Sequence, residues 1–356
     1  MGYEKQEKPG RKPFHGSGIT VSAPCRVDLG GTLDISTFYY PLMGLHPCTF
    51  NMAINLRTRV RVEPFEKGWI RVSSKGFESA CFPSMKAPYD HPMGLMFAIS
   101  DYFQADGLQI NIDSASPPRS ALGGSSVAAV ALIAALSKLY GPAHHLPGSR
   151  KEIALLAHRM ETLVAQVPCG IQDQLAAVYG GVNLWFWHSG FGGKEFSRKI
   201  LIRNKKVAGF GKRLLLAYCG NPHESLNING QWVRQFLSSE CRSQWTEIIA
   251  CTKNFAQALE KEDMNAACGF MNLETEIRMT LTPDVLDEVG KKLVIAAREK
   301  NCGARFAGAG GGGCVWALGS EDDIHILKNQ WEEILSIHEN AKLLDAGIDG
   351  QGLLFH

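Results

Sequence analysis

The segment PPRSALGGSSVAAVALIAAL, from Pro117 to Leu136, restricts the fold of this chain more than any other part of the sequence. Small residues from Gly123 to Ser126 lead directly into a long apolar run, which predicts a buried helix from about Ser125 to Tyr140. The bend before this helix has two interpretations. It is either a serine cap and nothing more, or a loop that binds an anion at the partly positive first turn.

The anion-binding interpretation has a clear physical basis. Four N–H groups in the first turn of a helix have no partner within the helix. Gly123 and Gly124 would let phosphate oxygens approach the backbone without meeting a β-carbon. The loop is not a Walker A loop, because no Gly-Lys pair in the chain is followed by Ser or Thr.

Strand-like and helix-like patterns alternate through both halves of the chain, which indicates an α+β fold. In the first half we expect strands over residues 18–29, 51–65 and 108–118, residues 68–74 as the partner strand of 51–65, a helix over 150–166, a short helix that ends at Tyr179 and a strand over 182–187. In the second half we expect a strand over 213–219, helices near 227–239, 244–259, 263–279, 283–300 and 321–336, two strands around residues 308–313, and a final strand. The 356 residues exceed the roughly 150 typical of one domain, so we expect two domains that meet near residues 190–200.

Charge and composition exclude several classes of function. The formal net charge of +2 gives no general attraction to nucleic acid or to anionic membranes, and no apolar run reaches the ~18 residues that span a bilayer. Residues 1–17 are polar and contain Pro and Gly, so we expect a flexible tail and not a signal peptide. Ten scattered cysteines without a Cys-x-x-Cys pair fit a reducing cytoplasm. No His-Glu-x-x-His is present, so no structural metal site is expected.

A second glycine cluster, GAGGGG, runs from Gly308 to Gly313. It matches the Gly-x-Gly-x-x-Gly dinucleotide pattern, but that pattern should open a helix after the first strand of a βαβ unit. Here an apolar strand-like run follows instead, so we reject the dinucleotide interpretation. Either the cluster is a flexible hairpin loop, or its backbone lies close to a ligand, which would justify the entropic cost of so many glycines.

Two further segments contain isolated charged residues. Asp173 lies among uncharged neighbours in VPCGIQDQ at a predicted helix start, where the helix dipole alone favours a carboxylate. Arg26 and Asp34 lie in APCRVDLGGTLD, on either side of a glycine pair. Taken alone, these two residues are equally explained as a solvated arginine and a turn aspartate.

Together the four segments resemble the GHMP kinases, the family that includes galactokinase, homoserine kinase, mevalonate kinase and phosphomevalonate kinase. APCRVDLGGTLD resembles the first motif of that family, PPRSALGGSSVAA the second, and CGARFAGAGGGGCVWAL the third. CGIQDQ is similar to the segment with the catalytic aspartate in galactokinases and to its counterpart in heptose-phosphate kinases. The resemblance covers about residues 20–356.

The resemblance implies a two-domain GHMP kinase fold. Residues 18–192 would form an N-terminal domain like the second domain of ribosomal protein S5. Residues 200–356 would form a ferredoxin-like C-terminal domain. ATP and a small-molecule substrate would lie in the cleft between them.

The resemblance also implies roles for single residues. Asp173 would be the general base and Arg26 would keep it ionised. The metal ion would be Mg²⁺, held by Glu161 and by Ser125. Ser126 is the alternative to Ser125. Glu161 could instead simply belong to the solvated face of an amphipathic helix. The remaining implied residues contact ATP phosphates (Leu122, Gly123, Gly124, Ser125, Ser126, Gly310 and Gly311) or the substrate (Asp34, Gly170 and Gly312).

The expected reaction is phosphorylation of a hydroxyl, the anomeric one, on a sugar or sugar phosphate. Arg119 and Ala121 depart from the family, because they replace glycines common in the second motif. Ala121 would restrict the loop, and Arg119 could reach a phosphate. LGGTLD lacks the Glu-His of galactokinases, which argues against galactose itself. The alternatives are a mevalonate-type alcohol kinase and a sensor that binds sugar and ATP without turnover.

Overall fold

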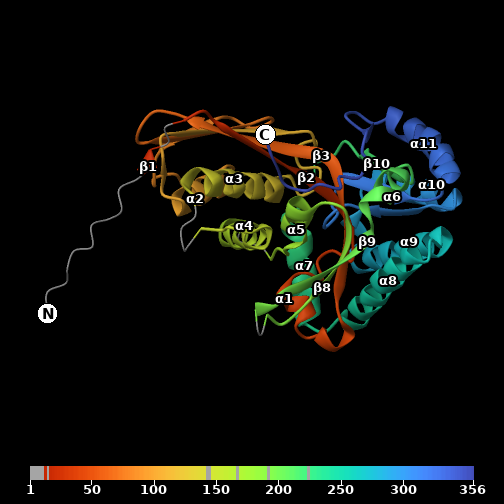
Figure 1. Cartoon of the computed structure of the whole chain (residues 1–356). Helices are drawn as coiled ribbons and strands as arrows, with labels where there is room; N and C mark the ends of the chain where they lie inside the picture. Colours follow the sequence, from red (N-terminus) through yellow and green to blue (C-terminus); the bar gives the residue numbers. More distant parts are fainter. Residues whose placement is uncertain (1–11, 14–15, 142–145, 166–167, 191–192, 223–224) are drawn as a thin grey trace.

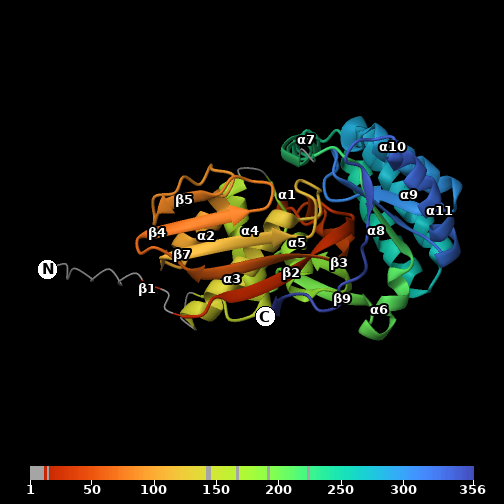
Figure 2. The ribbon, with the colours of Figure 1, turned by 90° about the horizontal axis from the view of Figure 1, so that it is seen from above.

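The computed structural model describes residues 12–13, 16–141, 146–165, 168–190, 193–222 and 225–356. Most of the tail expected over residues 1–17 therefore lies outside the described residues. Two β-sheets organise the chain, and each carries its own group of helices (Figures 1 and 2).

The first sheet contains eight strands among the described residues, in the order β14-β2-β3-β7-β4-β5, with β8 paired to β3 and β9 paired to β8. Their bounds are β2 (Ile19–Leu29), β3 (Cys48–Pro64), β4 (Trp69–Ser74), β5 (Ala80–Pro83), β7 (Leu108–Ser114), β8 (Val182–Trp187), β9 (Phe196–Ile202) and β14 (Leu354–Phe355). A separate short pair joins β1 (Lys12–Pro13) to β6 (Ala105–Asp106). Along β3, Val60 and Val62 are buried while Arg59 and Arg61 are exposed, as the alternating sequence predicts.

The helices of the first half lie on one side of this sheet (Figure 1). They are α2 (Gly94–Tyr102), α3 (Gly124–Tyr140), α4 (Arg150–Ala165) and α5 (Gln172–Tyr179), and a short α1 (Ser36–Tyr39) follows β2. Helix α3 is buried on all sides from Ser126 to Leu136 because the sheet covers one face and α4 another. The predicted helix at the start of the apolar run is therefore confirmed, and packing fixes the position of its first turn.

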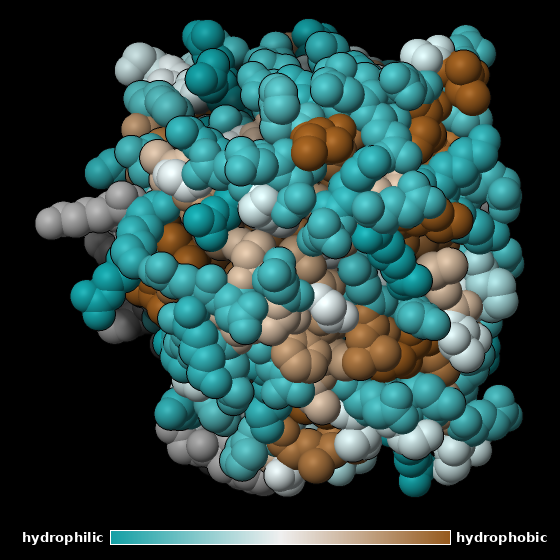
Figure 3. Space-filling model, turned by 90° about the vertical axis from the view of Figure 1, so that its right-hand side faces the viewer, coloured by the Kyte–Doolittle hydropathy of each residue, from teal (hydrophilic) through white to brown (hydrophobic). Residues whose placement is uncertain are grey.

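The second sheet has the order β11-β12-β10-β13. Its strands are β10 (Leu214–Tyr218), β11 (Gly303–Phe306), β12 (Cys314–Leu318) and β13 (Lys342–Leu344). The helices of this half are α6 (Asn204–Gly211), α7 (Ser225–Leu237), α8 (Arg242–Glu260), α9 (Met264–Leu281), α10 (Glu288–Glu299) and α11 (Glu321–Ser336), with short 3₁₀ turns at Pro283–Val285 here and at Met43–Leu45 in the first half. The face of this half seen in Figure 3 is mostly hydrophilic, with separate hydrophobic areas.

The path of the chain between the two halves differs from a simple cut near residue 195. Strand β9 pairs with β8 and so extends the first sheet to Ile202. The expected start of the second domain, residue 200, falls inside this strand. After the second sheet is complete, the chain returns, and β14 pairs with β2 at the edge of the first sheet.

One predicted strand pairing is wrong. The segment 68–74 does form a strand, β4, but β4 pairs in parallel with β7 and not as a hairpin with β3. Helix α2, which the sequence analysis did not predict, connects β4 to β7 and makes the parallel pairing possible. Because nearly all of α2 is buried, its sequence has no amphipathic pattern to reveal it.

Candidate active site

The centre of the site is an ion pair between Asp173, at the start of α5, and Arg26, in β2. Arg26 Nε donates to Asp173 Oδ1 at 2.7 Å and Arg26 Nη2 donates to Oδ2 at 2.9 Å, so both carboxylate oxygens are bound. The Arg26 side chain is 6 % exposed and that of Asp173 19 % exposed. Charges of the neighbouring aspartates offset burial and raise the pKa of Arg26 above its ordinary range. Arg26 therefore stays charged, and the pair is open to the cavity on the side of Asp173.

The Arg119–Ser126 loop lies directly over this pair. Arg26 Nη1 donates to Ala121 O at 2.7 Å, and the backbone N–H of Arg26 donates to Leu122 O at 3.2 Å. Gly123 has a φ of +81°, and a β-carbon there would lie 2.8 Å from Asp173 Oδ2. The first turn of α3 and the carboxylate of Asp173 are thus brought together, and glycine is required at position 123.

The two residues that replace family glycines in this loop keep the backbone conformation of glycine. Arg119 has a φ of +53° and Ala121 a φ of +62°. Left-handed backbone costs roughly 1–2 kcal/mol for a residue with a β-carbon. The two residues therefore place strain in the loop, and the expectation that Ala121 restricts the path of the phosphates stays a prediction.

The Gly308–Gly313 loop packs against the Arg119–Ser126 loop. All five glycines of the cluster have positive φ. A β-carbon on Gly308 would lie 3.0 Å from Ala121 O, and one on Gly313 would lie 2.7 Å from Ser120 O. At both ends of the loop, these glycines therefore allow its backbone to approach the backbone of the Arg119–Ser126 loop.

This packing changes which glycines face the site. Gly308 and Ala309 line the cavity, but Gly310, Gly311 and Gly312 are not among its lining residues. The N–H of Gly310 donates to Ala307 O, and that of Gly311 donates to Val285 O. These two amides are already occupied, so the structure does not bring the predicted phosphate contacts Gly310 and Gly311 into the site.

Asp34 lies close to the start of the same helix as Asp173. Its Oδ2 accepts a hydrogen bond of 2.9 Å from the N–H of Gln172, the first residue of α5. Asp34 and the predicted substrate residue Gly170 both line the cavity. Burial, with a smaller contribution from the charge of Asp173, raises the pKa of Asp34 to about 6.

Glu161 of α4 reaches the first turn of α3. Its Oε2 accepts a hydrogen bond of 2.6 Å from Ser126 Oγ and one of 2.5 Å from Gln174 Nε2. Burial, reinforced by the charge of Asp173, raises the pKa of Glu161 to about 7. Ser125 is exposed and has no such contact with Glu161. Of the two candidate serines, Ser126 is the one that contacts the carboxylate.

The oxygen set formed by Glu161 and Ser126 fits Mg²⁺, a hard cation that binds one or two carboxylates together with phosphate and water oxygens. No cluster of three or more His, Cys, Asp or Glu side chains that could hold a metal by themselves occurs in the described part of the chain. A site completed by substrate phosphates agrees with both observations.

These groups line one cavity of about 1270 Å³. Asp34, Asp173 and Glu161 are among the lining residues, and the charge of Asp173 acts on both of the other carboxyl groups. The cavity wall also includes a group of apolar residues: Phe77, Pro92, Met93, Leu95 and Met96. The sequence analysis missed Asn229 of α7, which lines the cavity from the second half of the chain. It also missed Asp28, a buried neighbour of Arg26 at 3.6 Å.

The geometry is suited to phosphoryl transfer, which depends on positioning and charge neutralisation more than on covalent catalysis. The Asp173 carboxylate with Arg26 beside it, the start of α3 and the Glu161–Ser126 oxygen pair surround one open volume. Such a combination is compatible with phosphoryl transfer.

Comparison with known proteins agrees with this geometry. Residues 91–181 match the family model of the GHMP kinases N terminal domain, and residues 255–337 match that of the GHMP kinases C terminal domain. The chain belongs to the GHMP kinases. It is therefore a phosphotransferase that acts on an alcohol group, and its two-domain α+β architecture is the fold of that family.

This GHMP kinase has relatives of two substrate types. It is 28% identical over 335 residues to the mevalonate kinase of Thermococcus gammatolerans. The alignment covers 85% of this chain and 90% of the relative. It is 30% identical over 171 residues to the galactokinase of Pyrococcus furiosus, which covers 46% of this chain and 45% of the relative. The Lactococcus lactis galactokinase complexed with galactose has a TM-score of 0.72 at 15% identity, covers 95% of each chain, and shows the fold alone.

Two further findings concern the chain as a whole. In the part of the chain that the structure describes, no helix combines the length and the apolar composition needed to cross a membrane. The ten cysteines are free thiols, and most of them are buried.

Proposed function

We propose that this GHMP kinase transfers the terminal phosphoryl group of ATP to the anomeric hydroxyl of a sugar or sugar phosphate. The observation that carries the proposal is the position of Asp173, which faces the cavity with both oxygens bound to Arg26. Asp173 would accept the proton of the substrate hydroxyl. Arg26 would stabilise the negative charge of the phosphoryl group during transfer.

The hydrogen-bond acceptors in the cavity wall support a polyhydroxylated substrate. Asp34 and Gln172 both line it, and Gln172 Oε1 is a buried oxygen without a hydrogen-bond partner among the described residues. Asn229 Oδ1 is also a buried oxygen without a hydrogen-bond partner among the described residues. Sugar hydroxyls can donate to all three acceptors and would satisfy the unpaired ones.

A mevalonate-type kinase is the second candidate, because the relatives matched over most of the chain include mevalonate kinases. The electrostatics of the site argue against it. Asp34 already has a raised pKa that the charge of Asp173 reinforces. The carboxylate of a substrate such as mevalonate would place a further negative charge beside these two groups, whereas sugar hydroxyls add none. For the same reason, the phosphate of a sugar phosphate would have to lie away from Asp34 and Asp173.

ATP would bind with its phosphates at the start of α3, at Gly123, Gly124 and Ser125, and its base beside the apolar residues of the cavity wall. Mg²⁺ would be held by Glu161 and Ser126. When bound, it supplies charge neutralisation for the phosphates. We also propose that the enzyme works in the reducing cytoplasm, since its cysteines are free thiols.

A coupled assay of ADP release tests the proposal with galactose, fucose, mannose, heptose 7-phosphate, inositol and mevalonate as substrates. We expect turnover with a sugar and not with mevalonate. Preference for mevalonate would establish the second candidate, and binding of sugar and ATP without turnover would indicate a sensor.

The variant Asp173→Asn tests the role of the base. We expect kcat for the preferred sugar to fall by ~10²–10⁴. Asp113→Asn is the matched control, because Asp113 is exposed on β7 and does not line the cavity. If Asp173→Asn keeps kcat within about tenfold, the general-base role is wrong.

A further inference from the structure

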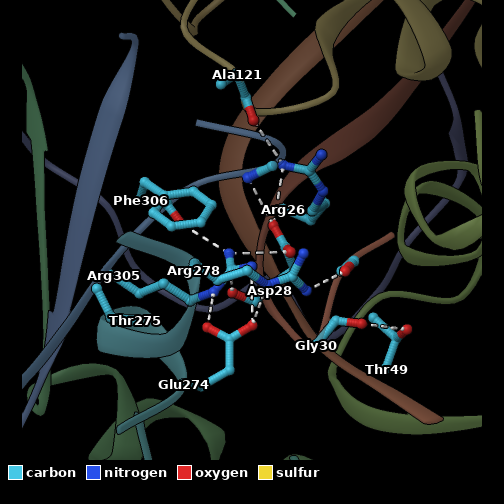
Figure 4. A network of polar contacts seen from close by, with 12 residues as sticks. Arg26, Asp28, Gly30, Thr49, Ala121, Glu274, Thr275, Arg278, Arg305 and Phe306 are labelled. Carbon is cyan, nitrogen blue, oxygen red and sulfur yellow. Dashed lines mark hydrogen bonds and ion pairs between the residues drawn. The ribbon is translucent and has the colours of Figure 1, made fainter. Parts of the chain in front are cut away.

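A chain of buried ion pairs runs from Arg26 into the second half of the molecule (Figure 4). Beyond the pair of Arg26 and Asp173, Asp28 Oδ1 lies 3.6 Å from Arg26 Nη1, and Asp28 Oδ2 lies 3.2 Å from Arg305 Nη1. Arg305 Nε in turn lies 2.8 Å from Glu274 Oε2. The side chains of Asp28, Arg305 and Glu274 are fully buried.

The carboxylate of Asp28 contacts both the Arg26 side chain and the Gly308–Gly313 loop. Its Oδ1, besides facing Arg26, accepts a hydrogen bond of 2.8 Å from the N–H of Gly308, which lines the cavity. Its Oδ2 fills the space beside Gly31, where a β-carbon would lie only 2.2 Å away. The Asp28 carboxylate thus fixes the position of Arg26, the partner of Asp173, and that of the Gly308 N–H, the first amide of the Gly308–Gly313 loop.

The far end of the chain of ion pairs reaches α7. Glu274 Oε1 accepts a hydrogen bond of 2.9 Å from Arg278 Nε, and Arg278 Nη2 donates to Gly31 O at 2.6 Å. The Arg278 guanidinium lies 4.6 Å from the ring centroids of Trp232 and of Trp245. Trp232 belongs to α7, the helix whose Asn229 lines the cavity.

Stability alone is a weak explanation for this arrangement. Three arginines and three carboxylates, counting the catalytic pair, balance one another in charge, but removing each of them from water costs several kcal/mol. A buried ion-pair cluster is often no more stable than apolar residues of the same volume. Its fixed hydrogen-bond directions do specify one relative position of β2, β11 and α9.

We propose that Asp28 is a positioning residue for catalysis, and that Arg305 and Glu274 transmit its position to the second half of the molecule. Asp28 keeps Arg26 aligned with Asp173 and keeps Gly308 at the rim of the cavity. This inference rests on the proposed roles of Asp173 and Arg26.

The first test is Asp28→Asn, which keeps the size of the side chain. The amide can still accept from Gly308, but its N–H₂ group meets the donors of Arg305. We expect kcat per folded enzyme to fall by about 10²-fold, because a small misplacement of reacting groups has that effect. The KM values for ATP and sugar should change by less than about threefold, since the altered contact is not a substrate contact.

Arg305→Lys is the second variant, and it keeps the charge but loses the planar fork. Its kcat should also fall. The double variant Asp28→Asn/Arg305→Lys should be no slower than Asp28→Asn alone, because both changes break the same chain of contacts. Multiplied losses would show that the two residues act independently, which contradicts the proposal.

Arg57→Lys is the matched control. Arg57 of β3 forms an ion pair with Asp349 and donates to Gly352 O at 2.6 Å, and neither Arg57 nor Asp349 lines the cavity. This control should lower the melting temperature and leave kcat per folded enzyme unchanged. A loss of kcat equal to that of Arg305→Lys would reduce the effect to general destabilisation and overturn the proposal.

Two comparisons keep the proposals separate. If Asp173→Asn is inactive but folded Asp28→Asn keeps its kcat, the positioning role fails and the proposed function stands. If Asp173→Asn remains active, the proposed base fails whatever Asp28→Asn does. Should Asp28→Asn not fold, Arg305→Lys decides by the same criterion: an unchanged kcat overturns the proposal.

Discussion

Gly170 adjoins the carboxylate of Asp34 so closely that a β-carbon on Gly170 would lie 1.7 Å from Asp34 Oδ2. No side chain can occupy this position unless Asp34 moves. Two segments 136 residues apart in the sequence therefore lie side by side in the wall of the cavity. The conformation of Asp34 depends on the absence of a side chain at position 170.

Gly170→Ala should displace Asp34 and weaken binding of the sugar. We expect KM for the sugar to rise at least about tenfold, because a hydrogen bond to a charged group contributes about 1.5–3 kcal/mol. Steady-state kinetics on the preferred sugar measures this. Gly209→Ala in α6 is the control, since a β-carbon there meets nothing within 4 Å. An unchanged KM in Gly170→Ala would contradict the assignment of Asp34 to the substrate.

The raised pKa of Asp34 predicts a pH dependence of stability. Because burial raises its pKa from 3.8 to about 6, the folded protein binds this proton more tightly than the unfolded chain. The stability that this proton contributes is fully present below about pH 4 and is lost as the pH rises through 6. Its maximum is of order 3 kcal/mol.

Asp34→Asn removes this contribution. Between pH 4 and 7, the wild type should lose free energy of unfolding relative to the variant, as measured by urea denaturation at several pH values. Burial also raises the pKa of Glu161, to about 7, so only the difference between the two proteins isolates Asp34. A difference that does not vary with pH would show that Asp34 is not buried as described.

Ser126 and Ser125 are predicted to differ in their effect on Mg²⁺. Ser126→Ala removes the hydroxyl that donates to Glu161 and should raise the Mg²⁺ concentration for half-maximal activity by about 10–100-fold. Ser125→Ala, at the exposed neighbouring position, should have a smaller effect. Titration of activity with MgCl₂ at fixed ATP compares the two. The opposite ranking would restore Ser125 as the ligand.

Ala121→Gly should make the protein more stable. The φ of +62° at Ala121 is strained for alanine and ordinary for glycine. We expect a gain of about 1 kcal/mol, after allowing for the greater freedom of glycine in the unfolded chain. Thermal unfolding measures it. Ala250→Gly, at an exposed position inside α8, should lose about 1 kcal/mol instead.

The sequence predicted those parts of the fold that local patterns determine. The apolar run after Ser126 became α3, and the alternation in residues 51–65 became β3. Helix α2 was missed because it is apolar on nearly every side, and the partner of β4 was wrong because pairing depends on which strand returns beside it. Neither feature leaves a local pattern in the sequence.

The candidate site likewise contains residues that the sequence predicted and residues that it did not. Asp173, Arg26 and Asp34 were predicted as site residues through the resemblance, and the structure brings them to one cavity. Asp28 was not predicted, although it lies two residues from Arg26. Its importance depends on Arg305 and Glu274, which are distant in the sequence, and no spacing rule connects them.

The return of β14 to β2 has a consequence for dissecting the enzyme. A fragment that stops after Ile202 would contain every strand of the first sheet except β14, and the outer edge of β2 would present unpaired backbone groups to solvent. Such open edges promote aggregation. Conversely, a protease that cuts the connection between the two halves would leave pieces that remain joined through this strand, so the nicked enzyme should elute from a sizing column as one particle.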